Sequence, residues 1–170
     1  DLAKALAARG VATLRYQFPY MEQGSKRPDS PAVAHQAVRA AVAEARRRFP
    51  DVALFAGGKS FGGRMTSQAQ SDEALDGVQG IVFVGFPLHP AGQPSTKRAE
   101  HLDRVDVPML FLQGTRDTLA DLTLIKNVVE QLTPRATLHI EEGADHSFHV
   151  LARSGRRDAQ VLEAVADSAA

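Results

Sequence analysis

The sequence predicts an α/β fold, a mostly parallel sheet with helices on both faces. Two observations carry this prediction. Short apolar runs alternate with longer segments in which apolar residues recur at helical spacing. The apolar runs also lack the alternation of polar and apolar residues that is typical of an antiparallel sheet with one wet face. No internal repeat or linker divides the chain, so we expect one domain over residues 1–170.

The predicted strands are short apolar runs bounded by glycine, proline or polar turn residues. They span residues 11–16, 52–56, 80–85, 107–113 and 136–140. Because sites in open parallel sheets form at the carboxyl ends of the strands, the residues that follow each strand deserve the closest inspection.

The predicted helices carry apolar residues on one side. They cover a short segment from Leu2 that stops at Gly10, residues 30–49, the segment after Ser60 to about residue 71, residues 119–132, and residues 157–166. Ser30 and Pro31 form a favourable start, with serine as the N-cap and proline at the first helical position. A loop rich in proline, glycine and serine precedes them.

Composition limits the functional class. The chain has 44% apolar and 24% charged residues, as expected of a globular protein with a core. Twenty basic residues balance twenty acidic ones, which argues against a nucleic-acid partner. The absence of cysteine excludes disulfides, thiolate zinc sites and a cysteine nucleophile. We see neither a membrane-spanning run nor a signal peptide, and we predict a cytoplasmic protein without a membrane partner.

The segment Gly58-Lys59-Ser60-Phe61-Gly62 matches the pattern G-x-S-x-G and lies between a predicted strand and a predicted helix. In this context a tight turn exposes the serine hydroxyl above the sheet, and the positions two residues to either side must be small. The following helix directs its positive end toward developing negative charge. The N–H of Phe61 would donate to an oxyanion.

A serine hydroxyl needs a base, and the base needs a carboxylate that orients it. Asp117 and His146 each follow a predicted strand, and the chain order Ser, Asp, His is that of α/β hydrolases. We therefore predict a catalytic triad of Ser60, Asp117 and His146. We expect no metal and no cofactor, since neither H-E-x-x-H nor paired-histidine spacing occurs.

Each of these residues has an alternative interpretation. Ser60 could be only a helix N-cap, and Asp117 could cap the helix that begins near residue 119. Asp121 is a rival acid and His149 a rival base. His89 follows the third predicted strand and could line a substrate pocket or be a solvated loop residue. His35 and His139 lie within predicted elements, so we expect structural roles for them.

Gly58-Lys59-Ser60 also resembles the end of a phosphate-binding loop, G-x-x-x-x-G-K-[ST]. The first glycine of that motif would fall at residue 53, which is Ala53, and the loop is too short to wrap phosphates. The dinucleotide motif G-x-G-x-x-G is absent. Both nucleotide-binding interpretations are therefore disfavoured.

With these residues in hand, the chain resembles small α/β hydrolases related to dienelactone hydrolase. It is most similar to the branch that includes testis-expressed protein thirty and subunit three of the NSL chromatin complex. The resemblance rests on five stretches, at residues 16–21, 57–65, 85–90, 111–117 and 144–148. It implies a Ser-Asp-His hydrolase fold on Ser60, Asp117 and His146. The serine differs from the cysteine nucleophile of dienelactone hydrolase itself, which argues against dienelactone as the substrate.

The resemblance also implies strands before the first helix, and a loop there that supplies the second oxyanion donor. Because Asp1 already lies in a predicted helix, we expect the chain to lack these N-terminal strands. Two hypotheses follow. The chain is a serine hydrolase acting on a small-molecule substrate, such as a small carboxylic ester or related acyl compound, or it is a non-catalytic interaction module on the same fold.

Overall fold

The computed structural model describes residues 1–170 and contains one sheet of four parallel strands. The strands follow one another in the order β1-β2-β3-β4, so each neighbour in sequence is also a neighbour in space. Their bounds are Leu54–Lys59, Val78–Val84, Met109–Gly114 and Ala136–Glu141. The predicted fold class is confirmed.

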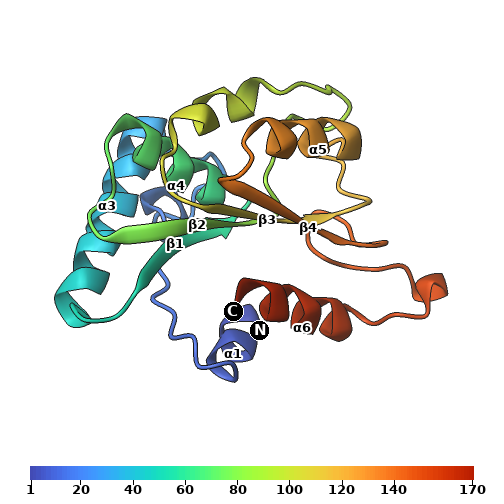
Figure 1. Cartoon of the computed structure of the whole chain (residues 1–170), viewed down its shortest axis with the longest axis horizontal. Coiled ribbons are helices and arrows are strands. Elements are labelled where there is room, and N and C mark those ends of the chain that lie inside the picture. Colours follow the sequence, from blue (N-terminus) through green and yellow to red (C-terminus); the bar gives the residue numbers. More distant parts are fainter.

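Helices pack on both faces of the sheet (Figure 1). One face carries α3, α4 and α5 with the 3₁₀ helix η1; α1 and α6 lie together on the other. The α-helices are α1 (Leu2–Ala7), α2 (Pro19–Glu22), α3 (Pro31–Arg48), α4 (Phe61–Asp72), α5 (Leu122–Gln131) and α6 (Asp158–Ala169). The 3₁₀ helices are η1 (Lys97–Arg104) and η2 (Ala152–Ser154).

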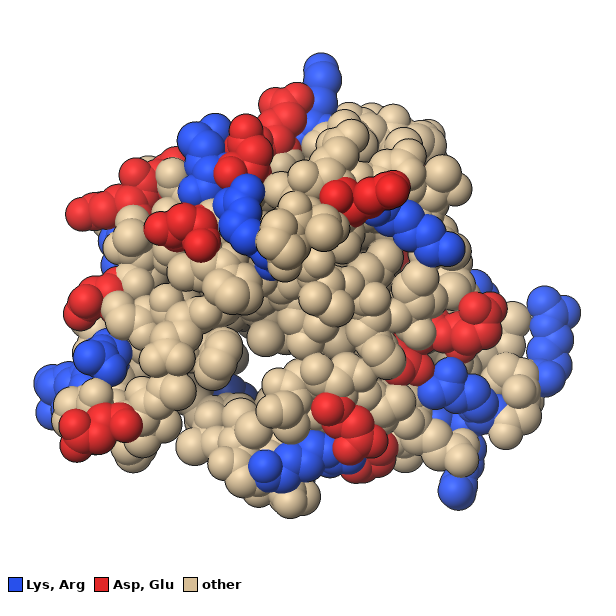
Figure 2. Space-filling view, viewed as in Figure 1, with Lys and Arg blue, Asp and Glu red and all other residues tan.

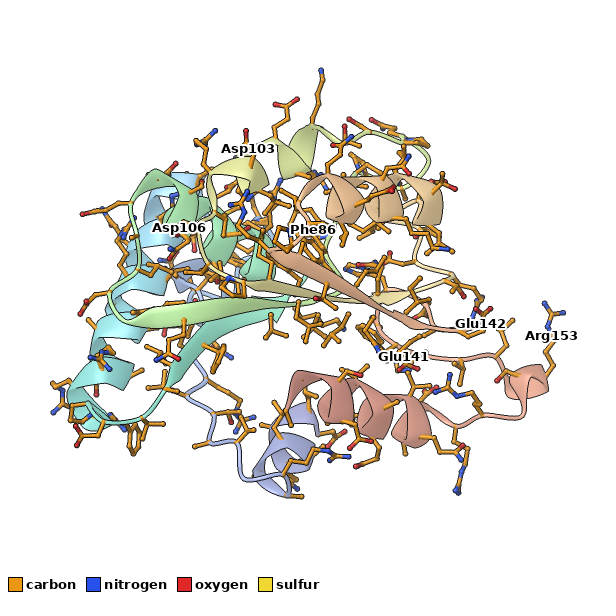
Figure 3. The ribbon with its side chains drawn as sticks, viewed as in Figure 1. Phe86, Asp103, Asp106, Glu141, Glu142 and Arg153 are labelled. Atoms are coloured by element: carbon orange, nitrogen blue, oxygen red, sulfur yellow. The ribbon has the colours of Figure 1, made fainter.

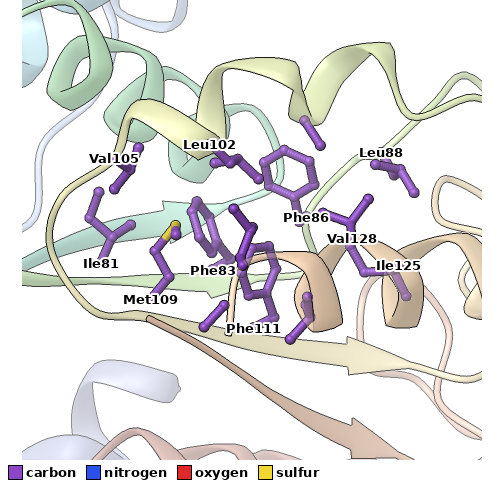
Figure 4. Close-up of a cluster of buried hydrophobic side chains, with 14 of the residues drawn as sticks. Ile81, Phe83, Phe86, Leu88, Leu102, Val105, Met109, Phe111, Ile125 and Val128 are labelled. Atoms are coloured by element: carbon purple, nitrogen blue, oxygen red, sulfur yellow. The ribbon is translucent and has the colours of Figure 1, made fainter. Parts of the chain in front are cut away.

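The largest apolar cluster lies between the sheet and the η1–α5 layer (Figure 4). Three fully buried rings, from Phe83, Phe86 and Phe111, form its centre, with centroids 4.4 to 5.8 Å apart. Ile125 of α5 and Leu102 of η1 close over them. These contacts pack β2 and β3 against the helical layer, and those two strands carry the loops that reach the candidate site.

The predicted strand at residues 11–16 does not form. These residues are mostly exposed, and no backbone hydrogen bond joins them to a strand. The physical reason is that a strand exists only through its ladder, and no partner strand lies beside this segment. Its β-branched and aromatic residues give strand propensity, but propensity depends on such pairing.

The first strand of the sheet also differs from its prediction. We expected it to end before the glycines, yet β1 continues through Gly57 and Gly58 to Lys59, which pairs with Val84. A Cβ on Gly57 would lie 2.1 Å from the carbonyl oxygen of Val82, so this glycine permits close approach of the two strands rather than a turn. The remaining predicted helices and strands form with ends shifted by up to three residues.

Charges of both signs are interspersed over the visible surface (Figure 2), in keeping with the neutral balance of the sequence. Among the helices, none combines the length and the apolar character needed to span a membrane.

Candidate active site

Ser60 occupies the sharp turn between β1 and α4. Its backbone has φ 51° and ψ −116°, a region that residues with a Cβ rarely adopt, and this conformation costs on the order of 1–3 kcal/mol. Two backbone bonds hold the turn: the Ser60 N–H donates to Val84 O at 3.1 Å, and the Arg64 N–H donates to Ser60 O at 3.2 Å. The sheet and the helix together impose the strain.

The glycines around the serine differ in the space that their surroundings would leave for a Cβ. A Cβ on Gly58 would lie 3.0 Å from backbone atoms of Gly62 and Gly63, and a Cβ on Gly63 would lie 2.7 Å from Gly58 O. By contrast, a Cβ on Gly62 would meet its first neighbour, Phe18 Cε2, at an ordinary 3.8 Å. The expectation that both positions two residues from Ser60 must be small therefore holds for Gly58 and is wrong for Gly62.

Ser60, His146 and Asp117 form one continuous chain of hydrogen bonds. His146 Nε2 lies 2.8 Å from Ser60 Oγ, and His146 Nδ1 lies 2.7 Å from Asp117 Oδ2. The Asp117 side chain is fully buried, whereas the imidazole is one-fifth exposed. The geometry suits the tautomer in which Nδ1–H donates to the carboxylate and Nε2 accepts from the serine hydroxyl.

The Asp117 carboxylate has two further partners. Oδ1 accepts from the Leu119 N–H at 2.8 Å, and Oδ2 accepts a short bond from Nε2 of Gln113. Gln113 is itself fully buried at the end of β3, and its Oε1 accepts from the Phe86 N–H at 3.0 Å. The carboxylate is thus tied to the main chain beyond both β2 and β3, which fixes the oxygen that faces His146.

The rival residues lie in other environments. Asp121 is the N-cap of α5 and accepts from the Leu124 N–H at 2.9 Å. His149 is exposed, and its Nδ1 lies 2.6 Å from Asp158 Oδ2. Asp117 also accepts one N–H in its own loop, as the capping alternative supposed, but its other oxygen faces His146.

His35 and His139 have structural partners. His35 Nδ1 lies 3.2 Å from Asp72 Oδ2 and links α3 to α4. His139 in β4 lies 2.9 Å from Glu141 Oε1 and 3.1 Å from Ser168 Oγ of α6. Glu141 is buried at the end of β4 (Figure 3). It also pairs with Arg156.

His89 is buried rather than solvated, and both of its ring nitrogens contact the main chain. Nδ1 lies 2.8 Å from Pro90 O, and Nε2 accepts from the Asp121 N–H at 2.7 Å. The ring therefore ties the loop after β2 to the start of α5. Both nitrogens are thus occupied by the main chain, while the residue itself lines a surface hollow together with Leu88 and Arg98, as expected of a residue beside a pocket.

Phe61 begins α4, and its N–H therefore has no acceptor within the helix. This leaves the group available beside Ser60, as expected of an oxyanion donor. The Phe61 ring packs against Phe18 and Tyr20, with centroids 5.2 and 6.0 Å away. An aromatic cluster from the loop before α3 thus lies beside the serine.

Lys59, directly before the serine, reaches the loop that carries the histidine. Its Nζ lies 3.2 Å from Ser147 Oγ, a contact between the turn after β1 and the turn after β4. Gly85, with φ 71°, lies against His146: a Cβ there would be 3.4 Å from the ring. The residues after β2 therefore form the neighbouring wall of the site.

Several hollows open on the surface, two of which are compared with the position of the triad. One, of about 460 Å³, lies along the loop after β2 and the start of η1, and its lining includes Leu88, Lys97 and Arg98. The other, of about 670 Å³, follows residues 13–17 beside Arg48. Neither hollow is lined by Ser60, Asp117 or His146. The first begins at Leu88, three residues after the Gly85 that lies against His146.

Gln113 was not among the site residues predicted from the sequence. A signal for it existed, because a polar residue at the end of a buried apolar strand is unusual unless it has a partner. The sequence could not identify that partner, since Phe86 and Asp117 reach it from different loops.

An α/β fold with a serine on a strained strand-to-helix turn, hydrogen-bonded to a histidine and a buried aspartate from later strand ends, defines the α/β-hydrolase class. The family comparison agrees: the model of the alpha/beta hydrolase domain matches residues 1–170, and the chain belongs to that family.

Solved structures give the same fold at low sequence identity. An alpha-beta serine hydrolase homologue from Coxiella burnetii is 23% identical with a TM-score of 0.76, covering 99% of this chain and 74% of that one. A serine hydrolase without lid from Xanthomonas campestris is 23% identical with a TM-score of 0.73, covering 98% and 69%. Est1E from Butyrivibrio proteoclasticus, solved with ferulic acid, is 15% identical with a TM-score of 0.68, covering 98% and 79%.

Proposed function

We propose that this protein is a serine hydrolase that cleaves small carboxylic esters or a related acyl bond. The observation that carries the proposal is the hydrogen-bonded chain from Ser60 through His146 to Asp117, at 2.8 and 2.7 Å. These lengths suit proton transfer from the serine to the imidazole without rearrangement.

In the proposed reaction, Ser60 Oγ attacks the ester carbonyl carbon while His146 Nε2 takes the hydroxyl proton. The Phe61 N–H donates to the oxyanion of the tetrahedral intermediate. His146 then returns the proton to the departing alcohol, and the acyl group stays on Ser60. A water molecule, deprotonated by His146, cleaves this acyl-enzyme and releases the acid, with the proton returned to Ser60.

Asp117 orients the imidazole and stabilises its charged form, and it keeps its own negative charge throughout. Gln113 acts through Asp117 as a positioning residue. The Leu119 and Gln113 bonds occupy the lone pairs that do not face His146, so the carboxylate has one favourable orientation.

We also place the chain in the dienelactone-hydrolase-related branch that includes testis-expressed protein thirty and NSL complex subunit three. The support is the set of motifs around the elbow and after the strands, with serine in place of the cysteine of dienelactone hydrolase itself. We therefore favour an ester over dienelactone as the substrate.

The test is hydrolysis of 4-nitrophenyl acetate by the wild type and by Ser60→Ala, His146→Ala and Ser71→Ala. Loss of a triad member should lower kcat about 10⁴-fold or more. The control Ser71→Ala removes a hydroxyl from α4 that only bonds Gln68 O, so its rate should match the wild type. A wild type with no activity above Ser60→Ala would instead support a non-catalytic module.

A further inference from the structure

Two arginines beside the candidate active site have no acidic partner. The ion pairs of the structure use other arginines, namely Arg9, Arg39, Arg47, Arg48 and Arg156. The Nε of Arg64 is buried and makes no hydrogen bond. Arg98 donates only to the carbonyl oxygen of Pro87, at 3.3 Å. Both side chains are partly exposed, but a buried guanidinium nitrogen is normally paired, so the Nε of Arg64 calls for an explanation.

The chain segments that carry both arginines lie close to the triad. Arg64 is one helical turn beyond Ser60, and its backbone N–H donates to the carbonyl oxygen of Ser60 at 3.2 Å. Arg98 is anchored to Pro87, two residues after Gly85, where an added Cβ would lie 3.4 Å from the His146 ring. The helix α4 and the helix η1 are in contact, so the two side chains approach each other from neighbouring elements.

Several positive groups act on one another near Arg64, although Asp72 and Asp103 act on His101 in the opposite sense. Burial, and then the charge of Arg98, lower the pKa of the Arg64 guanidinium. Burial and the charges of Arg104 and Arg64 likewise lower the pKa of His101 to about 4. An arginine stays charged at neutral pH. No ion pair of Arg64 or Arg98 offsets the repulsion between them.

We infer that Arg64 and Arg98 form an anion-binding subsite for a carboxylate or phosphate group of the ester substrate. The guanidinium fork matches the geometry of both anions. The adjoining hollow of about 460 Å³, with Arg98 and Lys97 in its lining, provides room for the chain that joins this anion to the ester. The preferred substrate is thus an ester with a second, anionic end. This inference rests on the proposed function and specifies its substrate class.

The first test compares mono(4-nitrophenyl) glutarate with the uncharged 4-nitrophenyl pentanoate. The wild type should prefer the anionic ester at least about 10-fold in kcat/KM. Arg64→Gln and Arg98→Gln should each lower this preference about 10-fold, mainly through KM, whereas Arg64→Lys should keep part of it. Arg153→Gln is the matched control: this exposed arginine lies on η2, away from α4 (Figure 3), and its preference should equal that of the wild type.

The second test needs no catalysis. In the Ser60→Ala protein, millimolar glutarate or inorganic phosphate should raise Tm, and the additional change Arg98→Gln should abolish the rise. Comparing the rise in Tm with glutarate and with phosphate, each measured alone, distinguishes a carboxylate site from a phosphate site.

The outcomes separate the two proposals. Equal kcat/KM for the two esters in the wild type, or a preference that Arg64→Gln and Arg98→Gln leave intact, overturns the subsite while ester hydrolysis stands. An equal loss in Arg153→Gln shows a general charge effect and also overturns it. If no ester is hydrolysed by any form, the proposed function fails, and the Tm measurement still decides whether the anion site exists.

Discussion

The residues of the candidate triad owe their arrangement to a buried amide. The side chain of Gln113 accepts a hydrogen bond from the Phe86 N–H and donates one to Asp117. Because the side chain is fully buried, water cannot replace either bond. A buried polar side chain is stable only with both partners in place. This side chain therefore couples the stability of the sheet edge to the orientation of the carboxylate.

Gln113→Met tests this coupling, since methionine keeps the volume and removes both polar groups. We expect the free energy of unfolding to fall by about 1–3 kcal/mol, because the Phe86 N–H loses its acceptor and Asp117 loses a donor. We also expect kcat for 4-nitrophenyl acetate to fall about 10-fold, which corresponds to about 1.4 kcal/mol of transition-state stabilisation, with little change in KM.

Urea unfolding and steady-state kinetics measure the two effects. Gln131→Met, at an exposed position on α5, is the matched control and should change neither. A destabilised Gln113→Met protein with wild-type kcat would show that the amide is structural only.

At the scale of elements, the turn between β1 and α4 depends on close backbone packing. Gly63→Ala would press a methyl group against Gly58 O, whereas Gly62→Ala has room. Overpacking commonly costs about 1–3 kcal/mol, and alanine gains up to about 1 kcal/mol over glycine within a helix. We therefore expect Gly63→Ala to lower the free energy of unfolding and Gly62→Ala to leave it unchanged or raise it. Urea denaturation measures the free energy of unfolding of both variants. Equal changes in the two variants would contradict this account.

The contact between α4 and η1 makes the stability of the protein depend on pH through His101. Its Nε2 lies 2.8 Å from Ser67 Oγ in a buried contact between the two helices. Burial and the charges of Arg104 and Arg64 lower its pKa from 6.5 to about 4, against the weaker opposite effects of Asp72 and Asp103. Between these values the unfolded chain holds a proton on His101 and the folded chain does not.

Stability from this group is thus complete above about pH 6.5 and decreases as the pH falls toward 4, by at most about 3 kcal/mol. Urea unfolding at pH 7 and pH 5 should show a smaller loss for His101→Asn than for the wild type. An identical loss in the two proteins would assign the acid sensitivity to other groups.

For the whole molecule, the parallel sheet brings the carboxyl ends of β1, β3 and β4 to one edge, and this topology makes much of the site predictable. Ser60, Asp117 and His146 were identified because each follows an apolar run that the sequence marks as a strand. The segment at residues 11–16 has the same local pattern, yet it forms no strand, because pairing depends on a neighbour that local sequence does not describe.

The same limit explains the other differences. Gly57 resembles a turn residue in the sequence, but it lies within β1 because Val82 approaches it closely. His89 lines a hollow as the sequence suggested, yet its two partners, Pro90 and Asp121, which the sequence could not identify, occupy its ring. Arg64 becomes notable only when the fold shows that its Nε is buried without a partner and that the charge of Arg98 acts on it. Such features depend on contacts between distant segments, which periodicity and motifs do not encode.

The central claim is that Ser60 is a nucleophile activated by His146. The most direct measurement is reaction of the protein with a fluorophosphonate, followed by mass spectrometry of its peptides. The account predicts a single adduct on the peptide that contains Ser60, absent from Ser60→Ala and formed far more slowly in His146→Ala. Absence of the adduct from the wild type, or equal labelling of Ser60→Ala, would contradict it.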